Sequence, residues 1–386
     1  VLDVLAQNEA DGVNPESYEK IAKFIVDECS DLAQILPVNY DNFSTKEKGR
    51  VTRAAAMALK SRVTLYMASP LFSEDSEDKW KQAAEAAYDI IKQKTDLGLD
   101  LVPYPQIFND VNNQKAEVIL YRPTGESGDF EKANFPIGVE GGKTSTCPTQ
   151  NLMEAYDMKD GTPFVWNNQS NPYDNRDPRM KYTIVCNEMK WPVDPVEIWE
   201  GGTNGLPLQN ATTTGYYLKK YVNNTISFEA GSTVTKKQHN WVLFRYGEIL
   251  LNYAEAMINA FHDPNYKDAV YNMSAREAVN QIRGRTNISL PGFPSDITEK
   301  DFVKRLKNER RVELAFEGHH FWDVRRWKEL GQTANIYGVK ITKNNEVISY
   351  EKFLLETRAV TDNMYFYPIP NTERFKNPNL GQNPGW

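Results

Sequence analysis

The stretch that decides the fold is residues 308–327, which read NERRVELAFEGHHFWDVRRW. Within it Glu309, Glu313 and Glu317 recur at every fourth position, so a helix would gather three carboxylates in one stripe. Like charges at this spacing repel one another, and the stripe is stable only where cations face it. The stretch therefore predicts a helix whose glutamates meet positive charges from other parts of the chain.

Arginine suits this task because its guanidinium group binds carboxylates through two parallel hydrogen bonds. The candidates are Arg245, Arg283, Arg285, Arg325 and Arg326. We predict a buried structural network between these arginines and the three glutamates, which ties several helices together. Gly318 is expected to break the helix that carries the stripe.

The same stretch offers three chemical alternatives. Glu317 and His320 have the spacing of half a di-iron carboxylate site, but the sequence holds no second Glu-x-x-His. A zinc protease would need His-Glu-x-x-His, which is also absent. Two carboxylates could serve as acid and base in glycoside cleavage, yet carboxylates that face arginines keep low pKa values and donate protons poorly. We therefore expect a structural role here, with no catalytic residue, metal or cofactor.

The composition is that of a globular protein with room for a large core, since 40% of the 386 residues are hydrophobic and 25% are charged. A net charge of -7 argues against nucleic acid as a main partner. No run reaches the ~20 apolar residues of a membrane-spanning helix. The aromatic share is 12%, with 20 Tyr and 8 Trp, and such rings suit faces that are flat, apolar and able to hydrogen-bond, as sugar faces are.

Hydrophobic periodicity divides the chain into three regions: a helical scaffold at 14–95, a loop-rich insert at 96–240, and a return to helix at 241–386 that ends in a pinned tail. Helices are expected between Pro15 and Pro37 and over 52–69, 76–94, 244–261 and 274–285, with Asn14 as the first N-cap. Short strands are expected at 117–121, 181–186 and 216–221, and a strand pair at 337–342 and 346–353. The predicted fold class is mainly α, with helical hairpins like those of tetratricopeptide repeats and a few short β-hairpins.

Aromatic residues of the insert are interleaved with asparagine and glutamine, and loops on a rigid scaffold are where binding residues concentrate. The candidate ligand-binding residues are Trp166, Tyr173, Trp191 and Trp199. Trp191 and Trp199 flank a segment that contains Pro and Gly and has few regular backbone partners, which could hold both indoles out on a loop. The alternative is that these rings form the small core of the loops themselves.

Several motifs stand out in the second half of the chain. They are RYGEILLNYAEA at 245–256, NQIRGR at 280–285, the stretch at 308–327, YPIP at 367–370 and NPNLGQNPGW at 377–386. In these motifs the chain resembles the SusD/RagB family, the surface glycan-binding lipoproteins of the Bacteroidetes outer membrane. Gly247 departs from the family pattern, which has Ala at this position.

The resemblance implies a single domain that binds oligosaccharides or polysaccharides at the cell surface without cleaving them. It also implies a SusC-like TonB-dependent transporter as the partner in glycan import, and attachment to the outer membrane through a lipid anchor that this chain lacks. Family members begin with a lipoprotein signal and further helices, so we expect the N-terminal part of the domain to be missing here. A glycoside hydrolase and a peptide- or protein-binding repeat scaffold remain the alternative functions.

Overall fold

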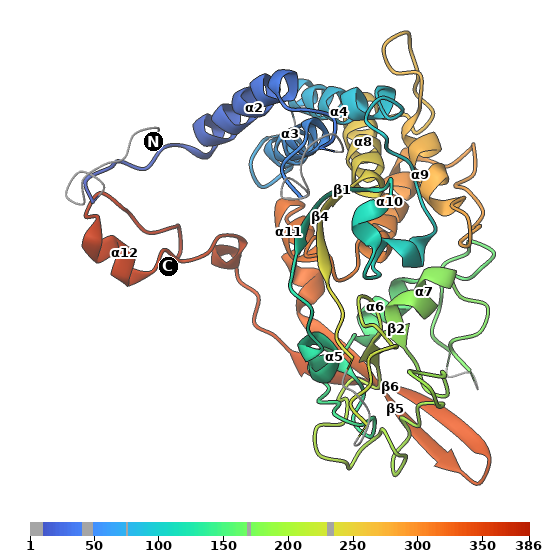
Figure 1. The fold of residues 1–386 in the computed structure, drawn as a ribbon. Coiled ribbons are helices and arrows are strands. Elements are labelled where there is room, and N and C mark those ends of the chain that lie inside the picture. Colours follow the sequence, from blue (N-terminus) through green and yellow to red (C-terminus); the bar gives the residue numbers. More distant parts are fainter. Residues whose placement is uncertain (1–10, 41–48, 75, 168–170, 230–234) are drawn as a thin grey trace.

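The computed structural model describes residues 11–40, 49–74, 76–167, 171–229 and 235–386. The longer helices gather at one end of the molecule (Figure 1). They are α2 (Tyr18–Ile35), α3 (Arg53–Ala68), α4 (Glu77–Lys92), α8 (Tyr246–Phe261), α9 (Ala275–Arg283) and α10 (Glu299–Glu313). Helices α2, α3, α4, α8 and α9 pack in that order, each against the next. The mainly helical class is thus confirmed, and none of the described helices is long and apolar enough to cross a membrane.

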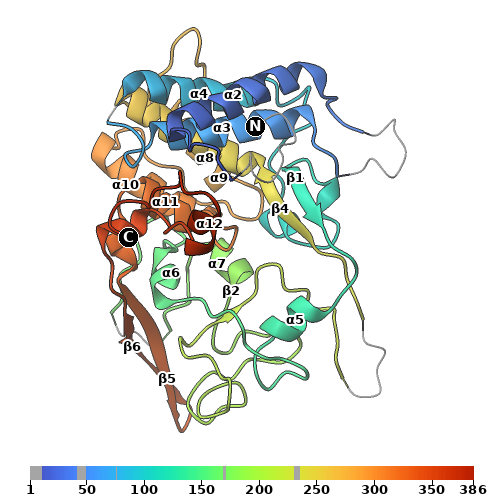
Figure 2. The ribbon, with the colours of Figure 1, turned by 90° about the vertical axis from the view of Figure 1, so that its left-hand side faces the viewer.

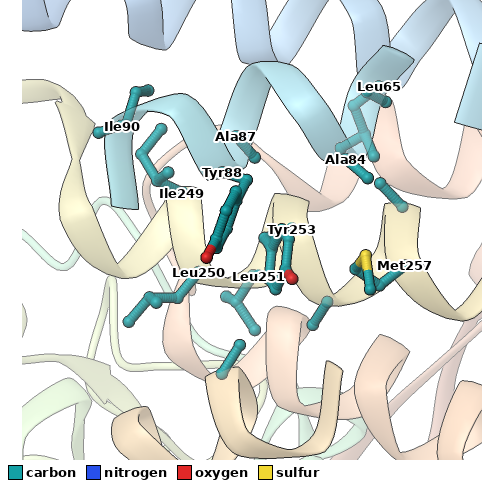
Figure 3. Packing of buried hydrophobic residues seen from close by; sticks show 14 of the residues in the cluster. Leu65, Ala84, Ala87, Tyr88, Ile90, Ile249, Leu250, Leu251, Tyr253 and Met257 are labelled. Atoms are coloured by element: carbon teal, nitrogen blue, oxygen red, sulfur yellow. The ribbon is translucent and has the colours of Figure 1, made fainter. Parts of the chain in front are cut away.

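Small side chains let the helices of this scaffold approach one another closely. Ala84 and Ala87 of α4 are completely buried, and Tyr88 stacks on Tyr253 of α8 with ring centroids 5.4 Å apart. Figure 3 shows these side chains together between the two helices. The hydrophobic core of the scaffold spans α3, α4, α8, α9 and α10, and its apolar burial supplies most of the driving force for this region at about 25 cal/mol per Å².

Element boundaries differ from the sequence prediction in several places. Helix α10 ends at Glu313, so the predicted break at Gly318 comes after a turn at 314–318, and three further differences have local causes. Helix α2 begins at Tyr18 because Ser17, and not Asn14, accepts a hydrogen bond from the Lys20 backbone as N-cap. Helix α8 begins at Tyr246, since residues 240–245 are an extended strand paired to another strand.

The third difference lies in the loop-rich insert, where a strand was predicted at 181–186. The structure has the helix α7 (Pro178–Thr183) before a strand of only two residues, β2 (Ile184–Val185). Asp177 caps this helix by accepting from the Arg179 backbone at 2.9 Å, and proline suits the first helical position.

The strands form three separate antiparallel pairs. They are β1 (Val118–Pro123) with β4 (Asn240–Arg245), β2 with β3 (Tyr217–Leu218), and β5 (Asn335–Asn344) with β6 (Val347–Thr357). The last pair is a long hairpin that reaches along the end of the molecule opposite the helical scaffold (Figure 2). Its turn has Asn345 in the left-handed region, with φ 54°, a conformation that asparagine tolerates well.

The insert and the hairpin share a second hydrophobic core, separate from the core of the helical scaffold. Its buried members include Tyr156, Tyr216 and Tyr217 from the insert and Val339 and Ile341 from the hairpin. The insert contributes the short helices α5 (Asp129–Asn134), α6 (Gln150–Ala155) and α7 to this region. Its 3-10 turns at Tyr104–Ile107 and Asn112–Gln114 lie elsewhere, and Tyr104 and Ile107 belong to a third, smaller cluster. Loops without regular structure are therefore held in place by their own packed side chains.

The chain after the hairpin forms a tail with one short helix, α12 (Asn371–Lys376). Tyr367 stacks on Phe321 of α11 (His320–Arg326), with ring centroids 5.9 Å apart. Farther on, the side-chain amide of Asn377 donates to the Val13 carbonyl oxygen at 2.8 Å. The tail thus contacts the body at its start and reaches the region before α2 at its end (Figure 1).

Candidate functional site

The stripe of glutamates lies where the helical scaffold meets the insert. Glu313 is fully buried and contacts three guanidinium groups: Oε1 lies 2.8 Å from Arg245 Nη1 and 3.0 Å from Arg285 Nη2, and Oε2 lies 2.8 Å from Arg179 Nη1. Burial opposes ionisation of this carboxyl, but the arginines outweigh it and hold the pKa of Glu313 well below its usual range. A buried carboxylate that contacts three guanidinium groups joins the segments that carry them, so Glu313 has a structural role.

The other two glutamates of the stripe extend the same cluster. Glu309 lies 2.7 Å from Arg283 Nη1, and Glu317 lies 2.7 Å from Arg245 Nε. Lys220, from the insert, reaches Glu317 at 2.8 Å. We call this set the glutamate network; its members are Glu309, Glu313, Glu317, Arg179, Lys220, Arg245, Arg283 and Arg285.

Sequence reasoning missed Arg179 and Lys220 of the glutamate network. It also missed the buried Glu117, which lies 2.8 Å from both Arg245 and Arg285, because all three residues come from the insert. Arg179 binds Glu309 as well as Glu313, and its own guanidinium is held by Asp177 at 2.7 Å. The adjacent sequence Asp177-Pro178-Arg179 is a helix start with a capping acid. This local pattern indicates that Asp177 orients Arg179, but it does not indicate that Arg179 binds Glu309 and Glu313.

Arg325 and Arg326 were both predicted to join the network, and the structure places both elsewhere. The Arg325 guanidinium lies 3.5 Å from the ring centroid of Phe321 and donates to the Phe321 carbonyl oxygen at 2.9 Å. The neighbouring Arg326 is the buried one, with Glu255 and Asp323 as partners. Successive residues of a helix point about 100° apart, so only one of two adjacent arginines can face the interior.

The buried carboxylates are poorly suited to acid–base chemistry. Burial alone would raise the pKa of Glu255, but Arg326 outweighs it and lowers the pKa to about 2. Burial also lowers the pKa of His320 to about 4. Within the ranges that the structure describes, no group of three or more His, Cys, Asp or Glu side chains is arranged to hold a metal ion.

A hollow of about 390 Å³ opens in the insert, beside the glutamate network. We call it the aromatic pocket. It is lined by Pro105, Phe108, Asn109, Asp110, Tyr182, Trp191, Lys219, Lys220, Tyr221, Val222, Asn223, Asn224, Thr225, Lys237 and His239. This volume is within the range of roughly 300–1,000 Å³ that small-molecule sites occupy.

The wall of the aromatic pocket combines fixed rings with polar groups. Phe108 meets Tyr221 edge to face, with centroids 4.9 Å apart. Trp191 is 6% exposed, and its indole N–H has no hydrogen-bond partner among the described residues. Asn224 is exposed beside the pocket, and Tyr182 is half-buried. The pocket therefore offers both ring surfaces and side-chain amides to a ligand.

Of the four candidate aromatic residues, Trp191 lines the aromatic pocket and the other three lie in other parts of the insert. Tyr173 is 8% exposed and packs edge-on against Tyr350, 5.3 Å away. Trp199 is half-buried, with the Lys343 ammonium group 4.6 Å from its ring centroid. Trp166 packs beside Phe164, with centroids 6.4 Å apart. The structure does not gather the four rings into one surface.

Sequence reasoning missed Phe108, Tyr182 and Tyr221, the other rings of the aromatic pocket. They come from separate segments of the insert, and no periodic pattern connects them. The one local signal is the sequence KKYVNN at 219–224, which places two lysines, a tyrosine and two asparagines close together.

A larger hollow, of about 610 Å³, lies between α3, the start of α11 and the tail. It is rich in aromatic residues, but these rings face one another. Tyr18 stacks on Phe72 with centroids 4.1 Å apart and planes 10° from parallel, and Phe366 meets Phe72 edge-on at 6.3 Å. Tyr18, Trp322 and Tyr367 keep exposed surface at this hollow, but no side-chain amide is among its described lining residues. The aromatic pocket, which combines rings with side-chain amides, is therefore the better candidate for a sugar.

Comparison with known proteins gives one family. The SusD family model matches residues 106–386, which is well over half of the chain. A segment of 163 residues is 29% identical to SusD-like protein P2 of Formosa agariphila, and it covers 41% of this chain and 28% of that protein. The chain thus spans little more than a quarter of this curated relative.

Solved structures agree with the family match. The fold is similar to that of a SusD-like carbohydrate-binding protein from Bacteroides fragilis, with a TM-score of 0.79 and 25% identity over 99% of this chain and 74% of that one. A second SusD-like protein from the same species has a TM-score of 0.76 and 26% identity over 96% and 72% of the two chains. Surface glycan-binding protein A from Bacteroides uniformis, at 17% identity and a TM-score of 0.63 over 95% and 69%, shares the fold.

Proposed function

This chain belongs to the SusD family, and we propose that it binds oligosaccharides or polysaccharides in the aromatic pocket without cleaving them. The observation that carries this proposal is the meeting of ring faces and amide groups in one hollow. Phe108, Tyr182 and Trp191 supply rings, and Asn223 and Asn224 lie beside them.

The chemistry of sugars matches this wall. A pyranose has an apolar face of C–H groups, which packs against an aromatic ring, and a rim of hydroxyl groups, which both donate and accept hydrogen bonds. Side-chain amides offer both functions. By analogy with bases stacked on aromatic side chains, each stacked ring contributes ~1–3 kcal/mol. A sugar would also shield the half-buried ring of Tyr182 from water.

The acids of the pocket support the proposal of binding without turnover. Glycoside cleavage needs two carboxyl groups, roughly 5–10 Å apart, on either side of the bond. Asp110 is the one carboxylate that lines the aromatic pocket among the described residues, and it lies 3.5 Å from the Lys237 ammonium group. A second acid to complete the pair is missing from this wall, which disfavours the glycoside hydrolase alternative.

The cellular setting of this function is proposed on family membership. The chain would act at the cell surface, held at the outer membrane by a lipid anchor. It would deliver glycans to a SusC-like TonB-dependent transporter. Co-purification of the full-length protein with such a transporter from outer membranes tests this part of the proposal separately from glycan binding.

The test of glycan binding is an array of oligosaccharides and polysaccharides probed with this chain, with product analysis of every glycan that binds. Binding without new reducing ends supports the proposal. Cleavage would establish the hydrolase alternative, and binding of peptides in place of glycans would establish the repeat-scaffold alternative.

A matched pair of variants locates the site. Tyr182 lines the aromatic pocket, and Tyr337 lies on β5 outside that pocket; both are half-buried. We expect Tyr182→Ala to weaken glycan binding about tenfold or more, the equivalent of ~1.4 kcal/mol, and Tyr337→Ala to leave it unchanged. Equal affinities of the two variants, at equal melting temperatures, would place the glycan elsewhere.

A further inference from the structure

The aromatic pocket contains one lysine whose charge has no anionic partner. Lys219 follows strand β3, and its Nζ lies 4.9 Å from the ring centroid of Trp191 and 3.6 Å from Met189 Sδ. Among the described residues, no carboxylate lies within ion-pair distance of this ammonium group. The side chain is half-buried, so its charge is partly removed from water, beside the Trp191 ring and the Met189 sulfur.

The other basic side chains of the aromatic pocket have acidic partners. Lys220 lies 2.8 Å from Glu317, and Lys237 lies 3.5 Å from Asp110. His239 lies 3.0 Å from Glu131 Oε1. Lys219 therefore leaves the pocket wall with one excess positive charge, beside the ring of Trp191.

An ammonium group in this position is costly without an anion. Burial lowers the pKa of Lys219, since the charged form loses hydration, and the nearby positive charge of Lys181 acts in the same direction. A bound anion would compensate for the lost hydration, and charge-assisted hydrogen bonds are about twice as strong as neutral ones.

We infer that the aromatic pocket prefers glycans with acidic sugars, whose carboxylate or sulfate group binds Lys219 while the sugar ring packs on the adjacent aromatic wall. This inference rests on the proposed function, because it names the glycan class for the same pocket. Uronic acids and sulfated sugars share the required chemistry: an anionic group attached directly to a ring with an apolar face.

The charge of the whole chain does not contradict this preference. The net charge is -7, which repels a polyanion at long range. At physiological ionic strength such repulsion is largely screened beyond about 8 Å. The contact at Lys219 acts at short range and is therefore little affected by the net charge. Because it is a single ion contact, glycan affinity should fall only weakly as the salt concentration rises.

The experiment measures affinity by calorimetry for three probes: a galacturonic acid oligosaccharide, its fully methyl-esterified form and a sulfated galactan oligosaccharide. Methyl esterification keeps the rings and linkages and removes the charge. We expect at least one acidic probe to bind about tenfold more tightly than the neutral ester. A sulfated probe that binds while the galacturonate does not would identify sulfate as the anion.

Variants assign the effect to Lys219. Lys219→Met and Lys219→Gln remove the charge, Lys219→Arg keeps it, and Lys92→Met removes an exposed lysine on α4 as the control. We expect the preference for the acidic probe to disappear in the first two variants and to persist in the other two. Melting temperatures establish that each variant is folded.

The outcomes separate this inference from the proposed function. Equal binding of acidic and neutral glycans, or an acidic preference that survives both Lys219→Met and Lys219→Gln, overturns the inference and leaves glycan binding intact. Failure of every glycan on the array to bind overturns the proposed function as well.

Discussion

Lys219 and Lys220 are adjacent in the sequence and belong to two regions with opposite electrostatic character. Lys220 is completely buried in the glutamate network, where Glu317 and the Ala315 carbonyl oxygen receive its hydrogen bonds. Burial lowers the pKa of Lys220 to about 8, against the opposing effect of Glu317. Lys219 lines the aromatic pocket beside Trp191 without a carboxylate among the described residues. The comparison teaches that a charge with protein partners stabilises the fold, whereas a charge without them is available to a ligand.

The largest effect is expected from removing the centre of the glutamate network. Glu313→Ala leaves the charges of Arg179, Arg245 and Arg285 buried with too few anions, which lowers the free energy of unfolding by about 3–5 kcal/mol. Urea denaturation measures this loss. Glu351→Ala, an exposed residue of β6, is the control and should change stability by less than about 0.5 kcal/mol. Equal stabilities of the two variants would mean that the network charges are effectively solvated.

Acid should weaken the buried ion pairs in a defined pH window. The pKa of Glu255 is lowered from 4.5 to about 2 in the folded chain. Because the folded value is the lower one, the carboxylate stabilises the fold above pH 4.5, and this contribution is lost as the pH falls through about 2. We expect the free energy of unfolding to decline across this window in denaturation series at successive pH values.

Glu255→Gln tests whether that decline belongs to the pair with Arg326. The variant should be less stable than the natural chain near neutral pH, and the difference between them should shrink as the pH falls toward 2. A constant difference across the whole series would contradict the assignment.

The two adjacent lysines provide the sharpest comparison. Lys220→Met removes charge-assisted hydrogen bonds to Glu317 and Ala315 and should lower the free energy of unfolding by about 1.5–3 kcal/mol. Lys219→Met breaks no ion pair and should change it by less than about 1 kcal/mol. Thermal and urea denaturation measure the stabilities of both variants. A Lys219→Met protein that is less stable than Lys220→Met would contradict this prediction.

The smallest effect is expected at Arg325, an arginine outside the network. Its stacking on Phe321 is partly exposed, and such a contact contributes about 0.5–1 kcal/mol. Arg325→Ala should therefore lower the free energy of unfolding by no more than this amount. A loss as large as that of Glu313→Ala would show that Arg325 supports the network indirectly.

The sequence was informative where the physics is local. Glu309, Glu313 and Glu317 follow a helical period, and the demand of buried acids for arginine holds in any fold. It was less informative about partners, because Arg179 and Lys220 reach the network only through the irregular path of the insert. The choice between Arg325 and Arg326 depended on the rotation of α11, which a turn at Gly318 sets.

The aromatic pocket was harder to predict than the helical scaffold. Trp191 could be selected because proline follows it in an irregular segment, but burial of Tyr173 among other rings depends on contacts with the distant hairpin. Rings of the pocket come from segments around Phe108, Tyr182 and Tyr221, and they meet in a third, smaller hydrophobic cluster that also contains Tyr104 and Ile288. Local sequence patterns describe each segment separately. They identify the aromatic residues but do not predict which of them line the same pocket.

The glutamate network also determines when the molecule can become complete during synthesis. Arg179 and Glu309 are 130 residues apart, and Arg179 leaves the ribosome first. Until residues 309–317 have emerged, Arg179 has its neighbour Asp177 as a partner but lacks Glu309 and Glu313, and Lys220 lacks Glu317. Since domains generally fold as they are synthesised, from the N-terminus onward, a chain released before α10 would contain Arg179 and Lys220 without the carboxylates that hold them in the folded molecule.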